Sequence, residues 1–108
     1  MSVTDSKIID SISIDPKGIV NLIISDHLEW DEKLEHLLIL QNKINDYLTF
    51  IESGQIFTEY PTLNGKNIVI NIFAKFIPNE AAETFLKMAR KTIQFAGYDL
   101  TLSLIEEQ

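Results

Sequence analysis

The chain has no cysteine among its 108 residues, and this absence excludes disulfide bonds, thiolate nucleophiles and zinc sites built on sulfur. No apolar run approaches the roughly 18 residues of a membrane helix. The N-terminal sequence MSVTDSKIID lacks the charged-then-apolar layout of a secretory signal. We therefore expect a cytoplasmic protein that does not contact membranes.

Basic residues are also scarce, because nine lysines and arginines stand against 16 acidic residues, for a formal net charge of −7. A negative surface repels phosphate backbones, so we expect no nucleic-acid partner and favour a basic protein if the partner is charged. The length and the 45% hydrophobic content suit a single α+β domain over residues 1–108, with residues 1–6 flexible.

Strand patterns occupy both ends of the chain. Residues 6–15 and 18–26 are β-branched runs separated by Asp-Pro-Lys-Gly, which predicts a β-hairpin. Residues 66–76 alternate strictly and predict a strand with one face buried, and residues 98–105 predict a final strand.

Two helix patterns lie between these strands. Residues 31–53 predict an amphipathic helix, capped at its start by Asp31, and residues 80–96 predict a second one, capped by Asn79. The order is ββαβαβ, and the predicted fold is a two-layer α+β domain with a four-stranded mixed sheet and two helices packed on one face. The predicted core stripe of the second helix is Ala81, Phe85, Met88, Ala89, Thr92 and Ala96.

Some apolar side chains fall outside these stripes. On the first helix, Ile39 and Phe50 lie on the side shared with charged residues, which makes them candidates for a second contact surface. The connection over residues 55–66 carries Ile56, Phe57 and Tyr60, and we expect it to pack on its own domain rather than to meet a partner.

The chain resembles a family of small bacterial single-domain proteins of unknown function. The resemblance is carried by SDHLEW at residues 25–30, by HLLILQNKINDYL at 36–48, by FIESGQI at 50–56 and by the Tyr-Pro pair at 60–61. It implies a bacterial origin and a stand-alone domain. It implies no activity, because the family it resembles has none assigned.

The stretch ISDHLEWDEKLEHL, residues 24–37, contains both histidines and raises the question of a metal or acid–base site. The spacing of His27 and His36 matches no metal motif, although Asp26 and Glu29 could complete a ligand set with them. The favoured alternative is a structural corner between strand and helix, fastened by Trp30. A third possibility is recognition of a ligand or partner through Asp26, His27 and Trp30.

Two functional classes follow. The first, which we favour, is a non-enzymatic protein-interaction module of a regulatory or immunity type, which binds another protein or itself as a homodimer and needs no cofactor. The alternative is a small-molecule or metal-dependent enzyme centred on Asp26, His27, Glu29 and His36. No catalytic or metal residue is assigned, and the predicted recognition residues are Asp26, His27, Trp30, Ile39, Phe50, Phe57 and Tyr60.

Overall fold

The computed structural model describes residues 3–4, 9–30 and 35–105. Its elements follow the predicted order, with a short helix and a 3-10 turn added between the first long helix and the third strand. They are β1 (Ser11–Ile14), β2 (Val20–Asp26), α1 (Glu35–Glu52), α2 (Gln55–Glu59), η1 (Pro61–Leu63), β3 (Ile68–Ala74), α3 (Glu80–Phe95) and β4 (Asp99–Leu104). The described part of α1 begins at Glu35, so the Asp31 cap lies outside the described residues.

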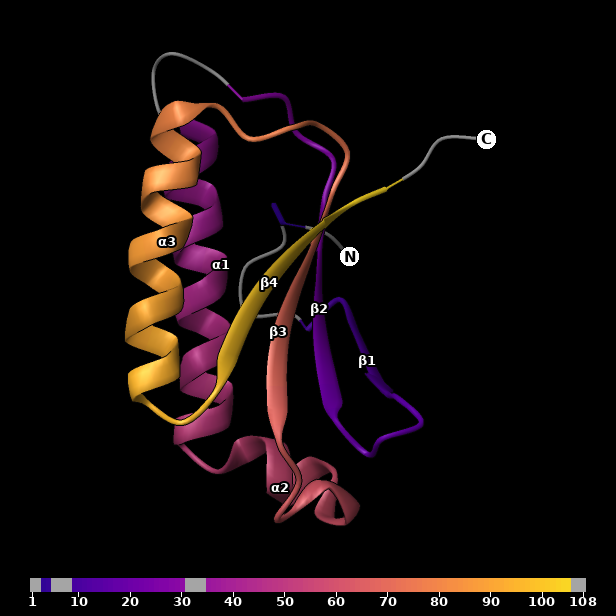
Figure 1. Ribbon diagram of the computed structural model, residues 1–108. Coiled ribbons are helices and arrows are strands. Elements are labelled where there is room, and N and C mark those ends of the chain that lie inside the picture. Colours follow the sequence, from indigo (N-terminus) through magenta and orange to yellow (C-terminus); the bar gives the residue numbers. More distant parts are fainter. Residues whose placement is uncertain (1–2, 5–8, 31–34, 106–108) are drawn as a thin grey trace.

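The strands form a four-stranded mixed sheet in the order β1-β2-β3-β4. β1 runs antiparallel to β2, while β2, β3 and β4 run parallel to one another. Helices α1 and α3 lie side by side on one face of this sheet (Figure 1). This arrangement confirms the predicted two-layer α+β fold. None of the described helices has the length and apolar character needed to span a bilayer.

The hairpin turn between β1 and β2 forms for the reasons that its sequence suggests. The Asp15 carboxylate accepts hydrogen bonds from the backbone N–H groups of Lys17 and Ile19, at 2.9 and 3.0 Å. Gly18 adopts a φ of 82°, a conformation that side chains disfavour. The turn sets the register of β1 on β2, with Ile14 opposite Val20.

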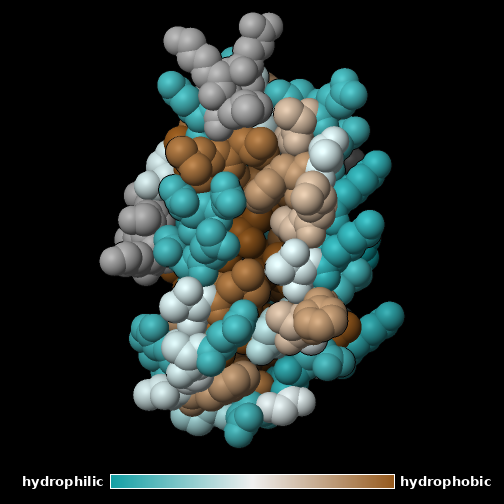
Figure 2. Space-filling view, turned by 90° about the vertical axis from the view of Figure 1, so that its left-hand side faces the viewer, coloured by the Kyte–Doolittle hydropathy of each residue, from teal (hydrophilic) through white to brown (hydrophobic). Residues whose placement is uncertain are grey.

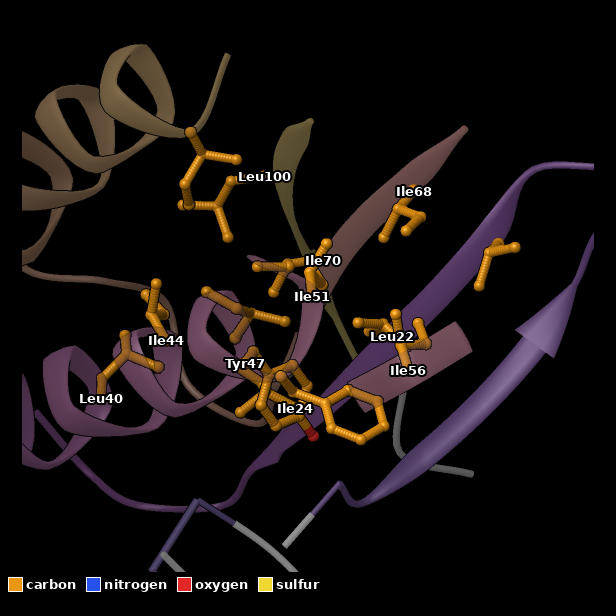
Figure 3. Packing of buried hydrophobic residues seen from close by; sticks show 14 of the residues in the cluster. Leu22, Ile24, Leu40, Ile44, Tyr47, Ile51, Ile56, Ile68, Ile70 and Leu100 are labelled. Atoms are coloured by element: carbon orange, nitrogen blue, oxygen red, sulfur yellow. The ribbon is translucent and has the colours of Figure 1, made fainter. Parts of the chain in front are cut away.

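The core lies between the sheet and the two long helices (Figure 3). Alternate residues of β2 and β3 are buried and face the helices, as the period of two predicts. The amphipathic pattern predicted for α1 is confirmed, because the apolar side chains of one of its faces, Leu40, Ile44, Tyr47 and Ile51, are buried. Within the segment predicted to be flexible, Val3 is buried and its N–H donates to the Ser25 carbonyl at 2.9 Å.

Phe50 is a core residue and not part of an exposed second surface. Its side chain is only 7% exposed, and Ile39 on the same helix is half-buried against the core. The expectation failed because α1 buries a wider arc than its aliphatic stripe indicates. That arc includes His36 and Lys43. Because these side chains are polar, the sequence pattern did not indicate that this side of the helix is buried.

The connection after α1 is helical and anchored. Ile56 in α2 and Leu63 in η1 are buried, while Phe57 is half-buried against the core and Tyr60 is exposed. The expectation that this segment packs on its own domain is confirmed for Ile56.

The buried face of α3 is rotated from the predicted stripe. Ala82 and Ile93, which lie outside that stripe, are buried, while Phe85 and Ala89 of the stripe are packed against the core together with Leu86. Arg90 hydrogen-bonds Asp99 at the start of β4 through Nε at 3.0 Å and Nη2 at 3.3 Å. Because these contacts turn one side of α3 to the sheet, Met88 faces outward and is 66% exposed.

The cap of α3 provides a first test of the local structure. The Asn79 side chain accepts a hydrogen bond from the N–H of Ala82 at 2.9 Å, which confirms the predicted N-cap. We expect Asn79→Ala to lower the free energy of unfolding by about 1 kcal/mol in urea denaturation. The control is Asn42→Ala, at an exposed position in the middle of α1, where no cap is lost. An equal loss in both variants would contradict the capping role.

Candidate functional site

The corner at the end of β2 contains a buried carboxylate–imidazole pair. Asp26 is the last residue of β2, and the strand's alternation places it on the core face, where it is 1% exposed. His36, in the first described turn of α1, is 3% exposed. Its Nε2 atom lies 2.7 Å from Oδ1 and 2.6 Å from Oδ2 of Asp26. This pair therefore joins the sheet directly to the helix.

The second nitrogen and one face of the His36 ring also make contacts. Its Nδ1 atom lies 3.0 Å from the Glu29 carbonyl oxygen, so each ring nitrogen faces an oxygen acceptor. The Trp30 ring stacks on His36 with centroids 3.7 Å apart and planes inclined by 19°. Trp30 Nε1 in turn donates to the Phe76 carbonyl at 3.2 Å. The His36 ring is thus held by β2 and by the corner, and Trp30 connects the corner to the segment after β3.

This geometry separates the predicted site residues. His27 is exposed, and the Glu29 side chain is exposed as well; Glu29 meets the His36 ring through its backbone carbonyl. Within residues 3–4, 9–30 and 35–105, no three histidine, aspartate or glutamate side chains come together as ligands for a metal. The corner described here corresponds to the structural alternative, with Trp30 fastening it and His36, rather than His27, as the partner of the carboxylate.

A second buried polar pair, this one between a lysine and an aspartate, lies on the same side of α1. The Lys43 ammonium is 2.9 Å from Oδ1 of Asp10, and both side chains are almost completely buried. The other oxygen of Asp10 accepts a hydrogen bond from the Ser25 N–H at 3.0 Å. Since Ser25 precedes Asp26 in β2, the Asp10–Lys43 and Asp26–His36 pairs lie at neighbouring positions of the same strand end.

Tyr47 completes this polar network. Its hydroxyl accepts a hydrogen bond from the Asp10 N–H at 2.8 Å and donates one to the Ile23 carbonyl at 2.5 Å. Burial raises the pKa of Tyr47 well above its ordinary value, so the hydroxyl keeps its proton and its role as a donor. This network was missed in the sequence. The available signal was that Asp10 and Lys43 both fall on apolar faces.

The other predicted recognition residues lie elsewhere. Phe50 and Tyr60 line a hollow of about 500 Å³ between α1 and α2, together with Asp46 and Glu59. Trp30 borders a shallow hollow of about 590 Å³ that it shares with Lys75 and Phe76. The structure therefore does not gather the predicted recognition residues into one site.

A more distinct surface feature is the groove between α1 and α3. It has a volume of about 320 Å³, and Figure 2 shows it as an apolar furrow between two polar flanks on the helical face. Its lining contains no charged side chain and consists of Gln41, Ile44, Asn45, Leu48, Phe85, Met88, Ala89, Thr92 and Ile93. Four of these residues belong to the stripe that the sequence assigned to the core of the second helix.

Comparison of the chain with models of protein families gives a match over residues 1–106 to DUF6572, a family of unknown function. No curated protein and no solved structure matches the chain. The family match confirms the resemblance to a family without an assigned activity.

Proposed function

We propose that this chain, which belongs to the family of unknown function DUF6572, is a non-enzymatic protein-interaction module that binds through the helical face around the α1–α3 groove. The observation that carries the proposal is the outward apolar stripe of α3. Met88 is 66% and Phe95 is 96% exposed on a helix whose sheet-facing side is already filled by other residues. Apolar area beyond the needs of the core is a mark of binding surfaces.

The charge distribution supports the same proposal. The chain carries a net charge of −7, yet no charged side chain lines the groove. The centres of protein–protein interfaces are depleted in charge and enriched in methionine and aromatic residues. Met88 and Phe85 meet that description, with the amides of Gln41 and Asn45 available for hydrogen bonds at the edge.

The titratable groups at the strand ends support a structural role rather than a catalytic one. Asp26 is paired with His36, and Asp10 with Lys43, at contact distances and with little exposure. Groups held in this way are engaged by their own fold, whereas a general acid or base must reach the proton of a substrate.

The proposal is tested by placing a photo-reactive benzophenone side chain at position 88, in place of Met88, and irradiating the native cells. We expect a covalent adduct with one defined protein, identified by mass spectrometry. The matched control carries the same group in place of Ile14, another exposed apolar residue, which lies at the end of β1 away from the groove. No adduct at position 88, or the same adducts at both positions, would overturn the proposal.

A further inference from the structure

Strand β4 forms one edge of the sheet, and β1 forms the other (Figure 1). Along a strand, the backbone groups of successive residues point alternately to its two sides. The N–H of Ile105, directly after β4, donates to the Ala74 carbonyl of β3 at 2.8 Å. The odd-numbered residues of β4 therefore face β3, and the backbone groups of Leu100, Leu102 and Leu104 point away from the sheet.

This edge is open to a further strand. The outward N–H of Leu100 donates to the Asp99 carboxylate at 2.8 Å. In the part of the chain that the structure describes, no group accepts a hydrogen bond from the outward N–H of Leu102 or Leu104. β4 also has none of the lysine or proline residues that protect many edge strands. The other edge strand, β1, has four residues against six in β4, so it offers fewer such groups.

A groove runs beside the open edge, between β4 and α3. This α3–β4 groove has a volume of about 320 Å³, and it shares no lining residue with the α1–α3 groove. Alternate side chains of a strand laid along β4 would point into it, because successive side chains of a strand face opposite sides. Three leucines give the groove an apolar floor, and its lining consists of Leu86, Lys87, Arg90, Leu100, Thr101 and Leu102.

Both charged side chains of the α3–β4 groove are cationic. Arg90 is paired with Asp99 at 3.0 Å, whereas no side chain of the described residues forms an ion pair with the exposed Lys87. Lys91, one turn further along α3, is exposed as well. The net charge of −7 opposes this local excess only weakly, because salt screens charges beyond about 8–10 Å. An acidic ligand in the groove therefore meets positive charge.

We propose that the α3–β4 groove binds an extended peptide segment of another protein, which adds to β4 as a further strand and places an acidic side chain beside Lys87. The outward backbone groups of Leu102 and Leu104 would hold its main chain, and its apolar side chains would cover Leu86. In strand addition, main-chain hydrogen bonds supply affinity and side-chain pockets supply specificity. This second binding surface goes beyond the proposed function and does not depend on the α1–α3 groove.

A random peptide library displayed on phage, selected on the full chain, supplies the probe. We expect the selected peptides to be rich in β-branched residues and to carry an aspartate or glutamate. One selected peptide is synthesised with a fluorescent label, and its binding is measured by fluorescence anisotropy. Lys87→Glu should weaken this binding by about tenfold or more, because it replaces attraction by repulsion.

The matched control is Lys17→Glu, the same change of charge at an exposed position in the turn beside the opposite edge strand. It should leave the binding of the peptide unchanged. Failure to select any peptide, selection of peptides without an acidic residue, or equal binding by the Lys87→Glu and Lys17→Glu variants would each overturn the proposal.

Amide hydrogen exchange followed by nuclear magnetic resonance tests the addition of a strand without any substitution. In the free chain, the N–H groups of Leu102 and Leu104 should exchange rapidly, because they face the open edge. The bound peptide should slow their exchange by about tenfold or more. The N–H groups of Thr101 and Ser103 already face β3, so their exchange should change less.

Two other patterns of protection would name a different occupant or a different site. If the peptide leaves Leu102 and Leu104 unprotected and instead protects residues of the α1–α3 groove, the proposal is overturned and the proposed function gains support. If both amides are protected in a dimer of the chain without peptide, a second copy occupies the edge and the proposal is overturned as well.

Discussion

Replacing Lys43 by methionine is expected to lower the free energy of unfolding by about 3–5 kcal/mol, the usual cost of removing one partner from a buried ion pair. The Asp10 carboxylate would remain buried with its negative charge uncompensated, since Lys43 Nζ contacts its Oδ1 at 2.9 Å. The hydrogen bond from the Ser25 N–H remains but does not replace a full positive charge. Urea denaturation followed by the fluorescence of the chain's one tryptophan measures the change.

Two further variants separate the ion pair from a general effect of losing a lysine. Lys66→Met, at an exposed position between η1 and β3, should change the free energy of unfolding by no more than about 0.5 kcal/mol. The double variant Asp10→Asn with Lys43→Met should lose less than the two single variants added together, because no buried charge is left unpaired. A strictly additive double variant would show that the pair is not coupled.

The strands of this protein could be predicted from the sequence because their burial follows one simple period. Residues 68, 70, 72 and 74 are apolar, and the structure buries them all. The parallel pairing of β2, β3 and β4 was left open, since alternation within one strand says nothing about its neighbours in the sheet. The cap at Asn79 was predictable because it depends only on local backbone groups.

The polar part of the core could not be predicted in the same way. His36 and Lys43 lie on the buried face of α1. A search for periodic aliphatic residues treats such polar positions as breaks in the pattern. Their burial becomes favourable only because Asp26 and Asp10 approach from another element, a tertiary pairing that no local pattern contains. For the same reason His27, which shares the stretch ISDHLEWDEKLEHL with five acidic residues, was named as a recognition residue, whereas the buried partner of Asp26 is His36.

The misassigned face of α3 bears on function. The apolar residues of α3 cover more of its circumference than the sheet can bury. Periodicity alone therefore could not show which of them face the sheet. In the structure, Ala82 and Ile93 face inward and Arg90 pairs with Asp99; these hydrogen bonds hold the pKa of the Asp99 carboxyl below its ordinary value. Met88 of the predicted core stripe is therefore left at the surface, where it forms part of the proposed binding face.

Two buried polar pairs help to hold that face in place. Asp26–His36 and Asp10–Lys43 connect α1 to the strand ends at positions seven residues apart on the helix, about two turns. Rotating or sliding α1 would separate these polar partners and leave a buried carboxylate without its partner, which is costly. The groove depends on the position of α1, because Ile44 and Leu48 form one of its walls.

Replacing His36 by alanine is expected to have an effect of similar size, a loss of about 3–5 kcal/mol in the free energy of unfolding. The Asp26 carboxylate, 1% exposed, would lose the ring that contacts both of its oxygens. Trp30 would also lose its stacking partner, a contribution of about 0.5–1.5 kcal/mol. The near-ultraviolet circular dichroism of Trp30 should weaken in the folded variant, because the ring loses its fixed neighbour.

The second histidine of the chain supplies the matched control. His27→Ala removes the same side chain from an exposed position nine residues away, and it should change the free energy of unfolding by at most about 0.5 kcal/mol. His36→Phe keeps a ring against Trp30 but offers no hydrogen bond to Asp26, so it should recover the circular dichroism signal and little of the stability. If His27→Ala proved as costly as His36→Ala, the corner would depend on contacts other than the Asp26–His36 pair. If His36→Phe restored full stability, packing rather than the ion pair would hold α1 against β2.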